Sequence, residues 1–102
     1  MNIFEDIPER LQEELFEDII VSQNIKIQRI VSDGHTTKKG SWYESSQNEW
    51  VIIIQGNATI TFEDENDTIL NVGEYINIPM FKKHRVSSTS KDEKTIWLAI
   101  HY

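Results

Sequence analysis

A chain of 102 residues is long enough for one domain with a single core, and its lack of cysteine excludes disulfide bonds and thiolate metal ligands. The net charge of −7, from 17 acidic and 10 basic residues, disfavours nucleic-acid partners, which need clustered Lys and Arg. The longest apolar run, residues 50–54, is far shorter than the ~20 residues of a membrane helix. With no basic, apolar leader at its start, we expect a cytoplasmic protein without a membrane partner.

The first predicted element lies in an acidic block over residues 5–18. Pro8 suits the first position of a helix, acidic residues suit its first turn, and Leu11 and Leu15 lie four apart on one face. These features predict a short helix within an N-terminal arm over residues 1–22. Its acidic side chains, Glu14 among them, are expected to form a solvated face.

After this arm the hydrophobic pattern changes to the alternation that is typical of strands. Short strands are predicted over 25–30, 49–55, 58–62, 68–72, 75–78, 85–89 and 95–101. Turns are predicted at Gly56-Asn57 and over 63–67. Such a series of short, regularly spaced strands predicts an all-β barrel or sandwich over 23–102, within a single domain of residues 1–102.

The strand over residues 49–55 is apolar on both sides. Because alternate side chains of a barrel strand point inward, an inward Glu49 brings residues 51, 53 and 55 with it and turns residues 50, 52 and 54 outward. Large apolar side chains on the outer face need a cover. The N-terminal segment or a second subunit would supply it, so a homodimer is expected.

Two groups of residues resemble the paired motifs of the cupin family. Six residues separate Glu49 from Gly56, five separate Gly73 from Pro79, and His84 lies five positions after the proline. These five residues take the places of Glu and the closing Gly in the first cupin motif, and of Gly, Pro and His in the second. The resemblance covers about residues 40–90 and implies a small RmlC-like jelly-roll barrel that commonly dimerises.

The sequence departs from both motifs at defined positions. Trp42 and Glu44 stand where the first motif has its two histidines, and Phe81 and Ser88 stand where the second has Gly and Asn. The chain is similar to a branch of small bacterial cupins that keeps aromatic and acidic residues in place of His-x-His. The usual three-His, one-Glu metal site of the family is therefore incomplete here.

The retained motif residues form the candidate metal site. His84 and Glu49 are expected on neighbouring strands inside the barrel, where they would hold a divalent metal (Ni, Fe, Mn or Zn) or a small ligand. A plain buried hydrogen-bonded pair is the alternative. Glu44, His35 and His101 are further candidate ligands, against ordinary solvent exposure for Glu44 and His35; which way His101 faces is left open.

Three further residues are candidates for lining a pocket: Trp42, Tyr43 and Gln55. Packing in the core or an interface is the alternative for the two aromatic residues, and polar filling for Gln55.

Three functional hypotheses follow from this pattern. The first is a metal-dependent enzyme acting on a small metabolite, the second a non-catalytic module that binds a small molecule, and the third a structural dimer without a site. Whether the protein is an enzyme is left open, and no catalytic residue is assigned. The sequence has no Gly-x-Ser-x-Gly elbow and no phosphate-cradling loop.

Overall fold

The computed structural model describes residues 1–63 and 66–102, which fold into antiparallel strands packed in two sheets. The strand bounds are β1 Leu15–Val21, β2 Lys26–Ser32, β3 Glu49–Gln55, β4 Ala58–Phe62, β5 Thr68–Leu70, β6 Tyr75–Ile78, β7 His84–Thr89 and β8 Thr95–His101. The predicted all-β class is confirmed. The turn expected over 63–67 includes residues 64 and 65, which lie outside the described residues.

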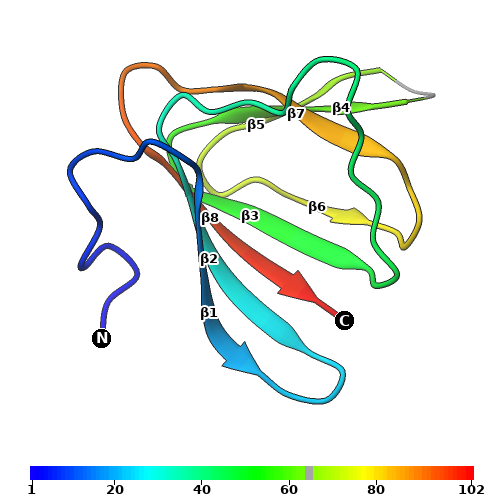
Figure 1. Cartoon of the computed structure of the whole chain (residues 1–102), viewed down its shortest axis with the longest axis horizontal. Helices are drawn as coiled ribbons and strands as arrows, with labels where there is room; N and C mark the ends of the chain where they lie inside the picture. The colour runs from blue at the N-terminus through cyan, green and yellow to red at the C-terminus, as the bar shows by residue number, and fades with distance from the viewer. Residues whose placement is uncertain (64–65) are drawn as a thin grey trace.

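The strands are arranged as a small jelly roll. The larger sheet has the order β1-β2-β8-β3-β6 and the smaller one β5-β4-β7 (Figure 1). The chain crosses between the sheets after β3, β5, β6 and β7, so β3 and β4, joined by a tight turn at Gly56-Asn57, belong to different sheets. The long segment 33–48 connects β2 to β3 and pairs with β7 through Tyr43 and His84.

The predicted N-terminal helix is wrong. No helix occurs in the part of the chain that the structure describes, and residues 15–21 instead form β1 at the edge of the larger sheet. Glu5, Glu9, Glu13 and Glu17 are spaced four apart, so a helix would stack like charges on one face. The β-branched Ile19-Ile20-Val21 that follows favours an extended strand, and pairing with β2 satisfies its backbone.

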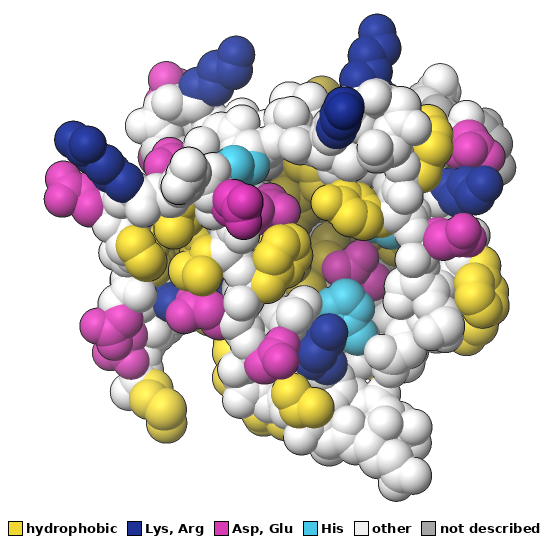
Figure 2. All heavy atoms as spheres, in the orientation of Figure 1, with side chains coloured by type: hydrophobic (Ala, Val, Ile, Leu, Met, Phe, Trp, Pro, Cys, Tyr) yellow, Lys and Arg dark blue, Asp and Glu magenta, His cyan; other side chains and the backbone are white. Residues whose placement is uncertain are grey.

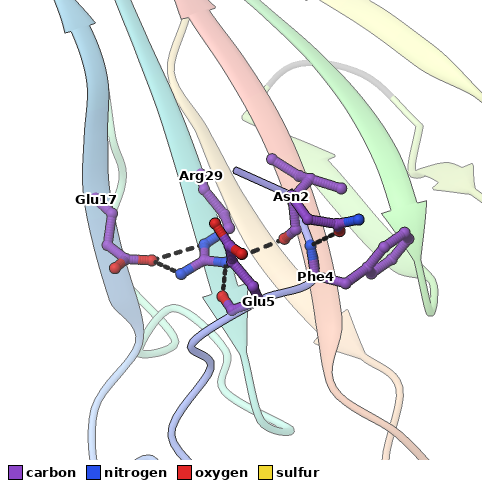
Figure 3. Close-up of polar contacts among 6 residues, drawn as sticks. Asn2, Phe4, Glu5, Glu17 and Arg29 are labelled. Atoms are coloured by element: carbon purple, nitrogen blue, oxygen red, sulfur yellow. Dashed lines mark hydrogen bonds and ion pairs between the residues drawn. The ribbon is translucent and has the colours of Figure 1, made fainter.

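The residues before β1 are attached to the outer face of the larger sheet through Arg29. The Arg29 guanidinium donates to the carbonyl oxygens of Ile3 and Glu5, at 3.0 and 2.6 Å, and pairs with the Glu17 carboxylate on β1 (Figure 3). Val31 and Ile96 face each other across β2 and β8 and are fully buried, although neither belongs to the main core. The N-terminal segment therefore supplies part of the cover that this face was expected to need.

The core lies between the two sheets and follows the predicted alternation. Val51 and Ile53 on β3 are buried in it, whereas Trp50 and Ile52 point to the other side and stay partly exposed. Ile60 on β4 packs against this layer from the smaller sheet. No helix that could span a membrane is found among the residues described here. The cytoplasmic location stays a prediction.

Candidate functional site

A cavity of about 220 Å³ lies between the sheets, where the core does not fill the barrel. Its wall is largely apolar and includes Phe16, Ile30, Val51, Ile60, Ile78, Val86 and Trp97. Its polar groups are Glu14, Gln28, Tyr43, Glu44, Ser45, Glu49, His84 and His101. Figure 2 shows a hollow on one face of the molecule in which hydrophobic, acidic and histidine side chains gather.

Glu49 stands between two imidazoles inside this cavity. Its Oε1 lies 3.6 Å from Nε2 of His84, and its Oε2 lies 3.7 Å from Nε2 of His101. His101 is directly opposite Glu49 in the β3–β8 register, so both side chains lie on the inner face of the larger sheet. His84 comes from the facing sheet, at the start of β7. The expected meeting of Glu49 and His84 is observed, although they lie on facing sheets rather than on paired strands.

The orientation of His84 is held by its neighbours. Its Nδ1 donates to the Lys82 carbonyl oxygen at 2.8 Å, and its backbone exchanges two hydrogen bonds with Tyr43. This leaves Nε2 directed at Glu49. Burial alone lowers the pKa of His84, but the Glu49 carboxylate and the Lys82 carbonyl outweigh it and raise the pKa above the ordinary value.

The orientation of His101 follows from a chain of hydrogen bonds. The Gln28 amide nitrogen donates to the Asp18 carboxylate at 2.9 Å, so the Gln28 amide oxygen faces His101. That oxygen lies 3.0 Å from His101 Nε2 and can only accept, so Nε2 carries a hydrogen. His101 therefore faces the cavity as a hydrogen-bond donor, which settles the orientation that the sequence left open.

Glu14 is a cavity residue that the sequence did not indicate. Its carboxylate accepts a hydrogen bond from the Ser32 hydroxyl, which in turn accepts from the Trp97 indole N–H at 3.1 Å. Burial raises the pKa of Glu14, and the Ser32 hydrogen bond and the charge of His35 offset this only in part. The β-branched residues Ile19-Ile20-Val21 favour a strand, and this signal could have indicated that the segment containing Glu14 is extended.

The other candidate residues are divided between the cavity and its surroundings. Tyr43 and Glu44 line the cavity. The Arg85 guanidinium lies over the Trp42 ring, with its Cζ 5.7 Å from the ring centre. Gln55 lies beyond a bulge in β3 and donates to the Lys94 carbonyl oxygen at 3.0 Å. His35 lies outside the cavity and donates from Nε2 to the Gln12 carbonyl oxygen at 3.0 Å.

These contacts do not complete a metal site. A catalytic cation commonly takes three protein ligands, and among the described residues no group of three or more His, Asp or Glu side chains is arranged to hold one. Nε2 of His101 donates to Gln28 and so offers no lone pair to a cation in this arrangement. Within the described cavity wall, Nε2 of His84 and Oε1 of Glu49 are directed at each other.

The comparisons with known proteins agree with the fold and the motif positions. The cupin domain family matches residues 31–101, and the chain belongs to this family. Its double-stranded β-helix is also that of an RmlC-like cupin from Methanocaldococcus jannaschii, with a TM-score of 0.73, 17% identity and coverage of 94% of this chain and 85% of that one. No curated protein is a significant match.

Two solved structures are more similar in sequence. A protein from Ralstonia eutropha JMP134, described as a putative mannose-6-phosphate isomerase, is 35% identical with a TM-score of 0.95, over 99% of this chain and 94% of that one. A cupin superfamily protein from Desulfitobacterium hafniense DCB-2 is 25% identical with a TM-score of 0.76, over 93% and 82% of the two chains.

Proposed function

We propose that this protein binds a small organic molecule in the barrel cavity and that His84, paired with Glu49, exchanges a proton with it. The observation that carries the proposal is an apolar cavity in which an imidazole and a carboxylate converge at 3.6 Å. Apolar pockets with a few convergent polar groups and a perturbed pKa are the common form of a binding or active site.

The geometry around His84 supports a role in proton transfer. Because Nδ1 donates to Lys82, the neutral imidazole presents a lone pair at Nε2 to the Glu49 carboxylate. Two acceptors face each other across this gap unless a proton or a donor group of a ligand lies between them. A bound molecule with an N–H or O–H group would supply that hydrogen, and the pair would accept or return it.

A cavity-filling variant tests the binding site. Val86 lines the cavity, so Val86→Phe should occupy part of it and abolish the thermal stabilisation that any cavity ligand produces in a metabolite screen. Val72→Phe makes the same change at an exposed position and should leave that stabilisation intact. Equal ligand stabilisation of both variants would place the binding elsewhere and refute the proposal.

A metal-dependent activity is a second candidate, favoured by two imidazole nitrogens within 4 Å of one carboxylate and by family membership. Metal analysis of protein purified without a His tag, compared with His84→Ala, separates the candidates. If the wild type holds stoichiometric metal and the variant does not, the metal-dependent activity replaces the metal-free proposal. Equal, negligible metal in the wild type and the variant would support the metal-free proposal.

We also propose a homodimer formed through the part of the larger sheet that the N-terminal segment does not cover. The outer patch consists of Trp50, Ile52, Tyr75, Leu98 and Ile100, which are apolar, partly or fully exposed and neighbours in the strand register. An apolar sheet face of this kind is typical of a protein–protein interface.

A further inference from the structure

Apart from two histidines, the side chains of the cavity wall that can carry charge are acidic. Of the described residues that line it, three are glutamates, Glu14, Glu44 and Glu49, and none is Lys or Arg. Lys26, opposite His101 in the strand register, does not line the cavity. Arg29 is engaged with Glu17 and the N-terminal segment on the outer face.

The hydrogen-bonding groups in the cavity are mainly acceptors. Glu14 and Glu49 present carboxylate oxygens, and Nε2 of His84 is directed at Glu49. Glu14 lines the cavity; its hydrogen-bond partner in the part of the chain that the structure describes is the neutral Ser32 hydroxyl, and the charge of His35 also acts on it. A buried carboxylate is costly unless a cation or several donors compensate it, so an occupant that donates hydrogen bonds and carries positive charge would lower this cost.

We propose that the cavity takes a small organic cation, an amine with an apolar portion, whose ammonium group faces Glu14 and Glu49. The carbon atoms of the amine would lie against apolar walls such as Ile60 and Trp97. This inference rests on the proposed function, because it names the class of molecule that the same cavity binds. An amine-binding cavity of this kind would exclude anionic metabolites as its ligands.

The charge of the cavity argues against a sugar phosphate as the occupant. A hexose phosphate carries a charge of about −1.5 to −2 at neutral pH. Placing it beside Glu14, Glu44 and Glu49 would add repulsion, and no Lys or Arg of the described cavity wall would offset it. The description of the Ralstonia protein therefore does not transfer to this cavity.

Matched probes of different charge test the inference on the full chain. The probes are 3-methylbutylamine, 3-methylbutan-1-ol and 4-methylpentanoate, which share an apolar end, with mannose 6-phosphate as a fourth. Dissociation constants come from amide chemical-shift titrations at neutral pH. We expect the amine to bind roughly tenfold more tightly than the alcohol, because its hydrogen bonds are charge-assisted. The two anions should bind most weakly.

Two matched variants identify the group that recognises the charge. Glu14→Gln removes the charge but keeps an oxygen that accepts from Ser32, so it should remove most of the preference for the amine. Glu13→Gln removes the same charge from an exposed neighbour that does not line the cavity, and it should keep the preference.

The outcomes separate this inference from the proposed function. Tighter binding of the alcohol or of either anion would overturn the cationic assignment but leave a small-molecule cavity in place. An amine preference that survives in Glu14→Gln and in Glu49→Gln alike would also overturn it. If no probe shifts the amides of the cavity residues, both the inference and the proposed binding site are refuted.

Discussion

At the scale of single residues, His84 and Glu49 titrate as neighbours inside a largely apolar wall. Burial is the largest single effect on the pKa of His84 and lowers it, but the Glu49 carboxylate 3.6 Å away and the Lys82 carbonyl together outweigh that effect. The raised pKa of His84 means that the folded protein holds this proton more tightly than the unfolded chain does. The pair therefore links stability to pH as well as serving the proposed proton transfer.

The Glu49→Gln variant should lower the pKa of His84, because burial then opposes protonation without the carboxylate. In the wild type, the stabilisation from protonated His84 is complete below the ordinary value of 6.5 and is lost as the pH rises through the raised pKa. The variant should lose most of this pH dependence. NMR titration of the imidazole Cε1–H signals and denaturant unfolding on both sides of this range measure the two effects. Glu93→Gln, in an exposed turn, should change neither.

The Glu14→Gln variant should raise the melting temperature at neutral pH by a few degrees. The pKa of Glu14 is raised by burial, so its favourable contribution exists below the ordinary value of 4.5 and is lost as the pH rises through the raised pKa. Above that range the ionised group lowers stability relative to glutamine. Thermal unfolding across this pH range is the measurement. A variant less stable than the wild type at neutral pH would contradict the assigned cause. A residue that lowers stability in this way is typical of a binding site.

At the scale of elements, the β3–β4 turn depends on a close approach between backbones. Gly56 has a φ of +82°, and a Cβ at this position would lie 2.9 Å from Cα of Thr95. The Thr95 hydroxyl also donates to the Asn57 carbonyl oxygen at 3.1 Å. The turn thus contacts the start of β8, at the point where the chain first passes from the larger sheet to the smaller one.

Gly56→Ala should be strongly destabilising, by about 3 kcal/mol or more, because left-handed backbone strain and a backbone clash add together. Gly73→Ala is the matched control: its φ of +84° is similar, but a Cβ there would meet nothing within 4 Å. It should cost only about 1–2 kcal/mol, from strain alone. Chemical unfolding of both variants gives the comparison, and equal losses would show that the clash contributes nothing.

The N-terminal strand explains how an acidic segment reaches the cavity. As a helix, residues 8–15 would have presented Glu14 to solvent, whereas the extended chain leading into β1 places Glu14 and the half-exposed Phe16 in the lining of the cavity. Phe16 is opposite Ile30 on β2, which fixes which face of β1 is internal. One change of secondary structure therefore moves a carboxylate from an expected solvated face into the proposed binding site.

At the scale of the whole molecule, the outer patch predicts association. Ile52→Lys places a charge at the centre of the patch, beside Leu98 and Tyr75 in the register, and should convert a dimer to a monomer. Light scattering coupled to size-exclusion chromatography measures the mass. Ile69→Lys makes the same change at an exposed position of the smaller sheet and should remain dimeric. A monomeric wild type would contradict the proposed dimer.

Local sequence patterns were sufficient for most of the architecture. Strand alternation and turn residues are encoded over a few positions, so the turn at Gly56-Asn57 and the inward face of β3 were predictable, whereas the placement of β3 and β4 in different sheets was not. The spacing of Glu49, Gly56, Gly73, Pro79 and His84 identified the family, which the match over residues 31–101 confirms. The same spacing predicted that Glu49 and His84 meet, and their side chains lie 3.6 Å apart.

The remaining features depended on contacts between residues distant in the chain. Propensity alone favoured a helix before residue 18, but pairing with β2 and the Arg29 contacts to the N-terminal backbone stabilise an extended chain. Likewise, Nε2 of His101 is a donor to Gln28 because Asp18 orients the Gln28 amide, a relation between three strands that no local pattern records. The sequence by itself determined the barrel and the His84–Glu49 pair. Only the tertiary structure decided which other charges surround that pair, because side-chain partners across sheets are set by packing rather than by spacing along the chain.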